Sequence, residues 1–223
     1  MLKTIIATLA LCSVVACAPV SGVLPPTATL QTEQGFSGES VTLVGRFDQR
    51  TDGRAAFTWP GSSVAFRFKG SSAAIRLAST ADIRFMVEVD GEKSELWVKA
   101  GEADYTLTSG LEDKPHQVRL TRLAESFSGV TALVSDPVTD GRLLAPPAPA
   151  SRRVLVIGDS ITAGYGVEGT SKDCSYSQAT STPLLAYASL MPISTPSPGP
   201  VLGYGVRTAK KSPSIRLLAS AVN

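Results

Sequence analysis

The chain has 223 residues, of which 43% are hydrophobic and 18% charged, and its formal net charge at pH 7 is +2. This composition is ordinary for a folded globular protein, and the length allows one large domain or two small ones. So small a net charge implies no nucleic-acid or polyanion partner.

Residues 1–17 predict an exported protein. Lys3 precedes an apolar run that ends at Ala16, and small residues follow, which is the pattern of a secretory signal peptide. The run is too short for a confident membrane-spanning helix. The tetrapeptide ending at Cys17 resembles a bacterial lipobox, so Cys17 is the expected lipid attachment site and the membrane the expected partner at the cell envelope. Ordinary cleavage near Ala16 or Ala18 is the alternative, and it would release a secreted protein.

The chain has three cysteines. Cys12 would leave with the signal peptide and Cys17 would carry lipid, so only Cys174 would remain as a thiol. No intramolecular disulfide is then possible in the mature chain, and no metal-ligand spacing is present. We therefore expect no metal site and no cofactor, with Cys174 unpaired in a loop.

Residues 18–37 are predicted to be a tether, and residues 38–135 an all-β domain. Val64–Lys69 and Arg84–Val89 alternate apolar and polar residues, the period of a strand with one buried face. An Asp-Gly pair at residues 90–91 supplies the positive φ angles that a tight hairpin needs. Short strands separated by Gly, Asp and Ser turns predict a β-sandwich or jelly roll.

Residues 136–152 contain four prolines and are predicted to be a stiff linker between domains. Val154–Ile157 is then continuously apolar, which is typical of a central strand in a parallel α/β sheet. An α/β domain is therefore expected to begin at residue 153. About 70 residues follow, whereas such domains usually need over 100, so we expect an incomplete α/β domain over residues 153–188.

Residues 189–223 differ from the rest of the chain. No acidic residue follows Asp173, prolines are frequent, and neither helical nor strand periodicity is present. This loss of local consistency predicts a non-native tail, caused by a disrupted reading frame after about Ala188. A genuinely disordered C-terminus is the alternative.

Gly158-Asp159-Ser160 lies at the carboxyl end of the predicted strand, where ligands bind in open α/β sheets. Ser160 would open the next helix, and its free backbone N–H could stabilise an oxyanion while its hydroxyl acts as nucleophile. The sequence is not a Gly-x-Ser-x-Gly elbow, because Thr162 takes the last position. A helix N-cap is the purely structural alternative for this serine.

The stretch VLVIGDSITAGYGVEGT resembles the first block of the SGNH (GDSL-type) hydrolases. Together with GRFDQRTDGRAAFTWPGSSVAFRFKGSSAAIRL, residues 45–77, it resembles carbohydrate esterase family 2. Members of that family are acetyl-xylan esterases with an N-terminal jelly roll and a C-terminal SGNH domain of flavodoxin-like α/β fold. The resemblance implies deacetylation of xylan or related glycans outside the cytoplasm, with an acetylated polysaccharide as the partner.

Carried over by this resemblance, Ser160 matches the nucleophile and first oxyanion donor, and Asp159 is expected to order the turn. Gly203, in LGYGV, is the candidate remnant of the family's oxyanion loop. The family's Asn donor and late Asp-x-x-His block have no match, because no histidine follows Ser160 and Asn223 is the only asparagine. The chain is therefore expected to be inactive or impaired as an esterase.

His116 is the only histidine. It follows a proline in what reads as a turn, so we expect a polar residue on the surface or on an edge strand rather than a base for Ser160. Glu168 and Asp173 could act as weak bases in principle, but nothing in their spacing favours this.

The only tryptophans are Trp59 and Trp97. Trp97 is expected in the core, whereas Trp59, near a Pro-Gly loop, could be either a core residue or a sugar-binding platform. The esterase hypothesis therefore has an alternative, a non-catalytic surface lipoprotein whose β-sandwich contacts glycans. A third possibility is a fragment without a selected role.

Overall fold

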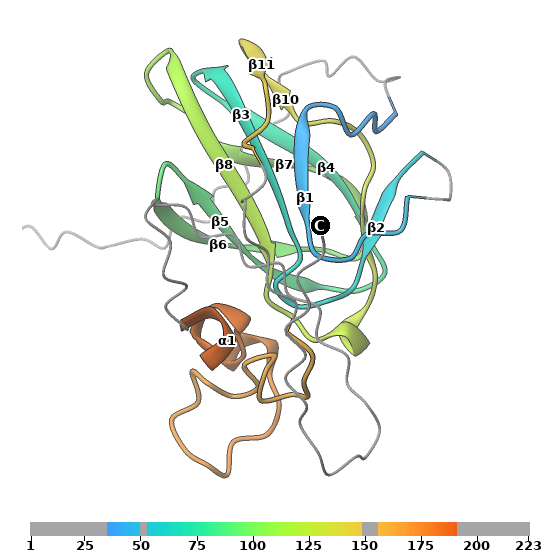
Figure 1. Ribbon diagram of the computed structural model, residues 1–223, viewed down its shortest axis with the longest axis vertical. Helices are drawn as coiled ribbons and strands as arrows, with labels where there is room; N and C mark the ends of the chain where they lie inside the picture. The colour runs from blue at the N-terminus through green and yellow to red at the C-terminus, as the bar shows by residue number, and fades with distance from the viewer. Residues whose placement is uncertain (1–34, 50–52, 149–155, 191–223) are drawn as a thin grey trace, which may run out of the picture. The chain divides into compact units, whose positions relative to one another are not determined.

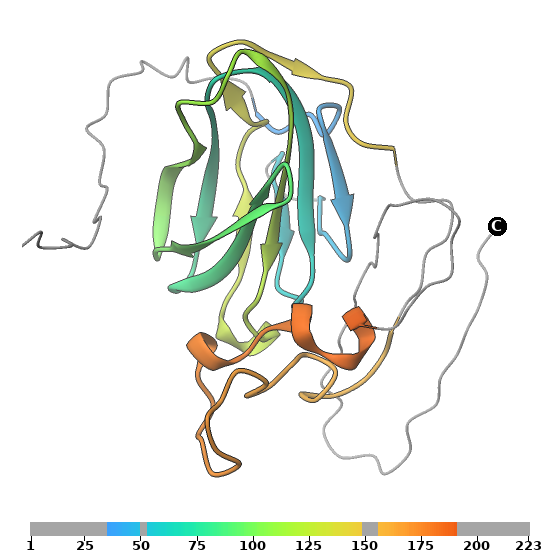
Figure 2. The same cartoon turned by 90° about the vertical axis from the view of Figure 1, so that its left-hand side faces the viewer.

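The structure, a computed structural model, describes residues 35–49, 53–148 and 156–190, all within one compact unit of the chain. Two antiparallel β-sheets lie face to face, and a segment with little regular structure follows them (Figures 1 and 2). The predicted signal peptide, Cys17, almost all of the tether, Gly203 and nearly all of the predicted tail lie outside the described residues.

The first sheet has the strand order β1-β3-β8-β5-β6, with β11 also pairing with β3. Its strands are β1 (Val41–Val44), β3 (Ser63–Gly70), β5 (Ile83–Val89), β6 (Glu92–Val98), β8 (Lys114–Arg122) and β11 (Arg142–Leu144). The second sheet has the order β10-β4-β9-β2, with β7 pairing with the other edge of β4. Its strands are β2 (Ala55–Phe57), β4 (Ala73–Ser79), β7 (Gly101–Thr108), β9 (Thr131–Leu133) and β10 (Val138–Thr139).

The core lies between the two sheets and follows the alternation in the sequence. Phe66, Phe85 and Leu120 project inward from the first sheet, and Ile75 and Leu77 from the second, each at most 1% exposed. Burying such a side chain contributes about 1.5–3 kcal/mol. The predicted all-β sandwich is confirmed.

The hairpin between β5 and β6 turns at Asp90 and Gly91, as predicted. Val89 pairs with Glu92, so the loop has only these two residues, and their φ angles are 52° and 95°. Both angles are positive, which is the requirement that favours Asp-Gly at such a turn.

The predicted linker boundary at residue 136 is wrong, because the sandwich continues past it. Val138 and Thr139 pair with β4, and residues 142–144 pair with β3, so the chain crosses from one sheet to the other here. The prolines that suggested a linker lie mostly after these strands. A second Asp-Gly turn, at residues 140–141, was the overlooked indication of strand pairing.

Asp140 holds this crossing against the turn between β3 and β4. Its carboxylate accepts hydrogen bonds from the backbone N–H of Ser71 at 2.9 Å and of Ser72 at 3.0 Å, and from the Ser71 hydroxyl. These bonds, that of the Ser71 hydroxyl first, lower the pKa of Asp140 to about 2. A Cβ on Gly141 would lie 2.0 Å from the Lys69 carbonyl oxygen, so the backbones meet too closely for any side chain.

Residues 156–190 contain η2 (Gln178–Thr180), η3 (Pro183–Leu185) and the single-turn helix α1 (Tyr187–Leu190). The described half of the expected buried strand, Val156 and Ile157, is not part of a strand, and Ile157 is 53% exposed. A central strand requires neighbours on both edges, and the described residues offer no parallel neighbour. The expected α/β sheet is thus absent from the described part of this segment.

We predict that Asp140→Ala lowers the melting temperature, because three donors lose their acceptor. The folded pKa lies below the unfolded value of about 3.9, so the stabilisation by the carboxylate is complete above that pH and lost as the pH falls towards 2. Thermal melts at pH 7, 4 and 2.5 would therefore show a shrinking difference from the unaltered chain. Asp113→Ala, at an exposed carboxylate 3.8 Å from Lys69, is the control and should change little; equal shifts in both variants would contradict the assignment.

Candidate active-site segment

The Gly-Asp-Ser stretch forms a tight succession of turns. Asp159 accepts a hydrogen bond through Oδ1 from the backbone N–H of Ile161 at 3.0 Å and through its carbonyl from Ala163 at 3.1 Å. The N–H of Tyr165 donates to the Ser160 carbonyl at 2.9 Å. Asp159 therefore orders the turn, as predicted, and does so by bonding to its own neighbouring backbone.

Two glycines are required for this turn. A Cβ on Gly158 would lie 1.9 Å from the Thr162 hydroxyl, and one on Gly164, whose φ is 76°, would lie 1.9 Å from the Thr182 carbonyl oxygen. The Thr182 N–H donates back to the Gly164 carbonyl at 3.1 Å, and the Thr162 hydroxyl bonds to that of Tyr187 at 2.8 Å. Close contact with the Thr162 side chain at Gly158 and with the Thr182 backbone at Gly164 thus fixes the turn at both ends.

Ser160 begins this succession of turns rather than a helix, so the expected helical N-terminus is not formed there. Its side chain is half-buried, and its hydroxyl has no hydrogen-bond partner among the described residues. The N-cap alternative fails for the same reason, because no helix follows. Ser160 remains an available hydroxyl in a rigid turn.

The buried carboxyl of Glu125, on the loop after β8, is an unusual feature beside this turn. The residue is 1% exposed, and neither carboxyl oxygen has a hydrogen-bond partner. Burial, which disfavours the charged form, raises the pKa of Glu125, and the carboxylate of Asp159 raises it further. The Glu125 carboxyl, close enough to Asp159 to feel its charge, therefore stays neutral over a widened pH range.

Arg122, fully buried at the end of β8, holds the loop that carries Glu125. Its guanidinium donates to the carbonyls of Gly129 at 2.8 Å, Glu125 at 3.2 Å and Ala124 at 3.3 Å, and to the Thr131 hydroxyl at 3.1 Å. Burial lowers the pKa of Arg122 to about 10, so the side chain stays charged at neutral pH. Sequence reasoning missed Glu125 and Arg122, because neither forms a local motif.

Aromatic rings join the same loop to the Ser160 segment. Tyr176 packs against Phe127 at 5.0 Å and Tyr165 at 5.2 Å between ring centroids, and its hydroxyl bonds to that of Ser128 at 3.1 Å. Aromatic pairs at such spacing stabilise by about 0.5–1.5 kcal/mol. The Ser160 segment therefore contacts the sandwich through aromatic packing and a hydroxyl hydrogen bond as well as through its carboxylates.

His116 is buried, contrary to the expected surface or edge position. It is 3% exposed on the central strand β8, opposite Phe68, whose ring lies 5.3 Å away. Nδ1 bonds to Asp90 at 2.6 Å and Nε2 to the Glu112 carbonyl at 2.8 Å, and the bond to Asp90 is the main cause that raises the pKa of His116. Because both ring nitrogens are engaged within the sandwich, His116 is not a base for Ser160, as predicted.

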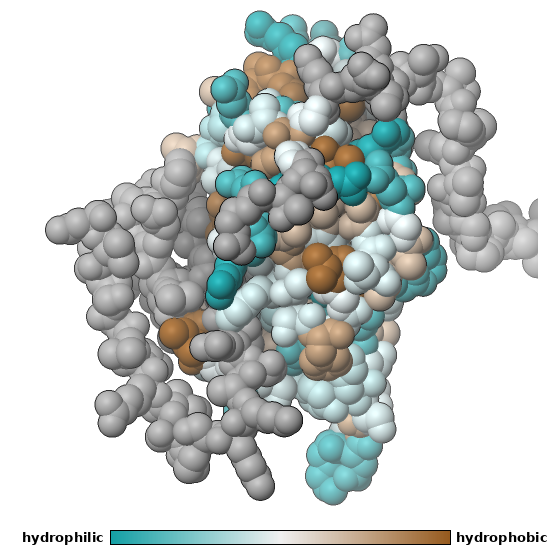
Figure 3. Space-filling view, turned by 90° about the vertical axis from the view of Figure 1, so that its right-hand side faces the viewer, coloured by the Kyte–Doolittle hydropathy of each residue, from teal (hydrophilic) through white to brown (hydrophobic). Residues whose placement is uncertain are grey.

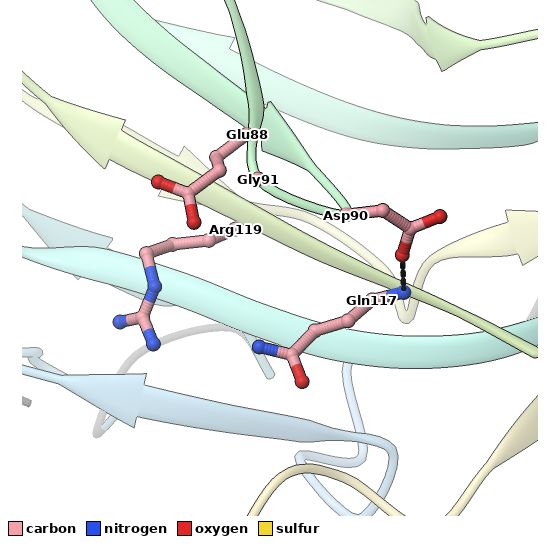
Figure 4. Close-up of a pocket in the computed structure, with 5 residues that line it drawn as sticks. All are labelled: Glu88, Asp90, Gly91, Gln117 and Arg119. Atoms are coloured by element: carbon pink, nitrogen blue, oxygen red, sulfur yellow. Dashed lines mark hydrogen bonds between the residues drawn. The ribbon is translucent and has the colours of Figure 1, made fainter. Parts of the chain in front are cut away.

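A polar hollow of about 360 Å³ lies beside this pair, on the sandwich (Figure 4). Its lining residues come from β5, β8 and the hairpin turn: Glu88, Asp90, Gly91, Gln117 and Arg119. Figure 4 shows the Asp90 carboxylate accepting from the backbone N–H of Gln117, at 2.9 Å. No residue of the Ser160 segment lines the hollow, so the two features are separate.

Neither tryptophan lies in the core. Trp97 is 39% exposed, which corrects the prediction, because Leu96 takes the inward position on β6 and Trp97 pairs with Arg84 on the outer face. Trp59 is half-buried, with the Arg46 guanidinium carbon 5.8 Å from its ring centroid. The ring of Trp59, the candidate sugar-binding platform, therefore already has the Arg46 guanidinium as a neighbour.

The remaining candidates are accounted for within the described residues. Glu168 pairs with Arg84 at 2.7 Å and Asp173 with Lys172 at 2.8 Å, so neither carboxylate is directed at Ser160 by a contact. Cys174 is a free, exposed thiol in a loop, as expected. In the described part of the chain, no group of three potential metal-ligating side chains occurs, and no helix has the length and apolarity to cross a membrane.

The Ser160 segment buries few of its own apolar side chains. Seven of its large apolar residues are between 41% and 70% exposed: Ile157, Ile161, Tyr165, Val167, Leu185, Tyr187 and Leu190. On the face of the molecule in Figure 3, visible apolar residues form separate patches between polar ones. Polar contacts must therefore provide much of the order of this segment.

The described chain is an antiparallel two-sheet β-sandwich that leads into a Gly-Asp-Ser turn with little regular structure. Residues 43–147 match the carbohydrate esterase 2 N-terminal family. The chain belongs to carbohydrate esterase family 2, whose N-terminal jelly-roll domain it carries.

Named relatives agree with this assignment. The chain is 33% identical to the cellulase/esterase CelE of Acetivibrio thermocellus over 147 residues, which are 66% of the chain. It is 34% identical to an acetylxylan esterase/glucomannan deacetylase of Cellvibrio japonicus over 121 residues, which are 53% of the chain. A family two carbohydrate esterase from Clostridium thermocellum, solved in complex with cellohexaose, is 32% identical over 67% of the chain, with a TM-score of 0.64.

The matched stretches cover 18% and 32% of the two curated relatives and 46% of the solved chain, so the chain spans less than half the length of these relatives.

We predict that Glu125→Gln stabilises the protein at neutral pH and leaves its stability unchanged at about pH 4. Because the pKa of Glu125 is higher in the folded than in the unfolded state, the folded state binds the proton more tightly. The free energy of unfolding therefore falls as the pH rises from the pKa of the unfolded state through the pKa of the folded state. The neutral amide cannot ionise and so avoids this loss, which means that the stability gain of Glu125→Gln should grow as the pH rises. Urea unfolding between pH 4 and 8 would measure it, with the exposed Glu39→Gln as control. A Glu125→Gln effect that does not vary with pH would contradict the neutral carboxyl.

Proposed function

We propose that this chain belongs to an exported carbohydrate esterase that removes acetyl groups from xylan or related glycans, with Ser160 as the nucleophile. The observation that carries the proposal is the rigid Gly-Asp-Ser turn that follows a carbohydrate esterase 2 N-terminal domain. The names of the relatives, an acetylxylan esterase among them, support the substrate class.

The proposed chemistry is acyl transfer to a serine. Ser160 Oγ attacks the acetyl carbonyl carbon, the sugar oxygen leaves with a proton, and water then hydrolyses the acetyl-serine ester to acetate. The backbone N–H of Ser160 is the proposed first oxyanion donor. A general base must remove the hydroxyl proton, since a serine hydroxyl is a poor nucleophile at neutral pH.

We propose that this 223-residue chain lacks that base and has impaired turnover. Its single histidine, His116, has both ring nitrogens engaged by Asp90 and Glu112. The nearest acidic candidate along the sequence, Glu168, is paired with Arg84. Loss of a catalytic base from a serine hydrolase costs about 10⁴-fold or more in rate.

Free imidazole should therefore restore part of the activity. We predict that acetate release from acetylated xylo-oligosaccharides is very slow with the chain alone, rises with imidazole, and is abolished by Ser160→Ala. Ser94→Ala, on the exposed face of β6, is the matched control and should behave like the unaltered chain. Imidazole-dependent release that survives Ser160→Ala would rule out Ser160 as the nucleophile, and no release under any condition would count against the esterase proposal for this chain.

We propose further that the protein is exported and anchored to the bacterial envelope by lipid on Cys17, on the evidence of the signal-like N-terminus alone. Several acyl chains would anchor it firmly, whereas one chain binds only marginally. Expression in a bacterial host with labelled palmitate should give a labelled membrane-bound protein, and Cys17→Ala should remove the label. Cys12→Ala is the control that should retain it; label that persists in Cys17→Ala would refute the site.

A further inference from the structure

Arg84 is a buried charge on the outer face of the sandwich. It is 3% exposed on β5, and its guanidinium reaches two carboxylates. Nη2 donates to Glu95 on the neighbouring strand β6, and Nη1 donates to Glu168 in the Ser160 segment at 2.7 Å. The bond to Glu95, followed by that to Glu168, raises the pKa of Arg84, so the charge is permanent. One cation thus links the sandwich to a residue 84 positions later in the chain.

The same guanidinium also binds backbone of that segment. Nη1 lies 3.1 Å from the carbonyl oxygens of Gln178 and Ala179 and 3.4 Å from that of Ser181. In return, the Gln178 side chain accepts from the backbone N–H of Arg84 at 3.1 Å and donates to the Asp82 carbonyl at 2.9 Å. Gln178 therefore bonds to the backbone at the start of β5, next to the point where the pairing of β5 with β8 begins at Phe85, and Arg84 and Gln178 together hold residues 178–181.

From residues 180–182 the contacts continue to the nucleophile turn. The N–H of Glu168 donates to the Thr180 carbonyl at 3.0 Å, and that of Gly166 to the Ser181 hydroxyl at 2.9 Å. Tyr165, next to Gly166, donates to the Ser160 carbonyl at 2.9 Å. Hydrogen bonds therefore connect Arg84 to Ser181, Ser181 to Gly166 and Tyr165 to Ser160, and the peptide bond between residues 165 and 166 completes the connection.

We propose that Arg84 is a positioning residue for Ser160: the sandwich holds the nucleophile turn in place through this guanidinium, together with Gln178. This inference rests on the proposed function only in calling Ser160 a nucleophile. It makes the sandwich a structural part of the esterase site rather than a separable glycan-binding module.

The chemistry of the contact requires arginine. A lysine ammonium is a compact charge, whereas the guanidinium has its donors in a fixed plane: Nη2 donates to Glu95, and the two hydrogens of Nη1 are shared among Glu168 and the three carbonyls. Removing it would leave the carboxylate of Glu168 and the carbonyls of residues 179 and 181 without the Arg84 donor, and the Gln178 carbonyl with only the Ser181 N–H at 3.4 Å. Since the segment buries few apolar side chains, its local unfolding would then become easier.

Hydrogen exchange provides the direct test, because it needs no activity. In Arg84→Gln we expect peptides that cover residues 160–168 to exchange about 10- to 100-fold faster, the equilibrium factor of a lost charge-assisted hydrogen bond, and in Gln178→Ala, which loses two neutral hydrogen bonds, about 5-fold or more. Peptides from β3 and β8 should be unchanged. Gln178→Ala keeps the test valid if Arg84→Gln fails to fold, because residue 178 lies outside the sandwich strands.

Arg76→Gln is the matched control. Arg76 makes a two-pronged ion pair with Asp104, at 2.8 and 2.6 Å, on the other sheet, and has no contact with the Ser160 segment. Its loss removes an arginine–carboxylate ion pair, more exposed than that of Arg84, without affecting the contacts between Arg84 and the Ser160 segment. Unchanged exchange of residues 160–168 in both test variants, or equal acceleration in Arg76→Gln, would overturn the inference.

Covalent labelling gives a second readout that a merely structural role would not change. With a fluorophosphonate and imidazole, Ser160 Oγ attacks phosphorus, the P–F bond breaks, fluoride leaves, and imidazole takes the hydroxyl proton. Arg84→Gln should lower the maximal labelling rate about 10-fold or more, the expected effect of a misplaced nucleophile, with an unchanged half-saturating probe concentration. Arg84→Lys should recover only part of the rate.

The two proposals fail in different ways. Absence of labelling at Ser160 even in the unaltered chain would refute the nucleophile, while the exchange data would still decide the contact with Arg84. Unchanged labelling and unchanged exchange in Arg84→Gln and Gln178→Ala would refute the positioning role and leave Ser160 as nucleophile unaffected.

Discussion

The structure depends on one buried guanidinium, that of Arg84, which donates both to carboxylates and to backbone carbonyls. Arg84 is buried on the outside of the sandwich, where water would normally solvate a charge, and it is stabilised there only by acceptors from both parts of the chain. Burying an unpaired charge would be strongly unfavourable, so the sandwich and the Ser160 segment each complete an environment that the other requires. Charge-assisted hydrogen bonds are also directional, which allows them to fix a backbone position as well as a distance.

Close backbone packing complements this polar contact. Gly158 and Gly164 approach Thr162 and Thr182 so closely that a methyl group would not fit, and Gly141 meets Lys69 in the same way at the sheet crossing. A side chain at any of these positions would force the backbones apart. The turn that carries Ser160 is thus fixed both by close packing that leaves no room for a side chain at its glycines and by hydrogen bonds.

Sequence reasoning identified what depends on local pattern. Alternation predicted the strands around Phe66 and Phe85, and the Asp-Gly pair predicted the hairpin between β5 and β6, because both effects act within a few residues. His116 was misplaced since its burial depends on its register with Phe68 and on Asp90, a partner 26 positions away. The motif gave Ser160, but the contacts of Arg84 on β5 with Glu168 and residues 178–181 could not be read from the motif.

The exposed apolar residues of the Ser160 segment make the polar contact more significant. Ile161 is 70% and Leu190 63% exposed, so this segment has no hydrophobic core of its own within the described residues. An element of this kind normally frays, because its backbone loses entropy on ordering without compensating burial. Here the sandwich supplies the compensation, at Arg84 by charge-assisted hydrogen bonds and at Phe127 by ring packing with Tyr176 of the segment. The sandwich can therefore order the nucleophile turn before any further apolar surface covers it, which is the physical basis for treating the two as one site.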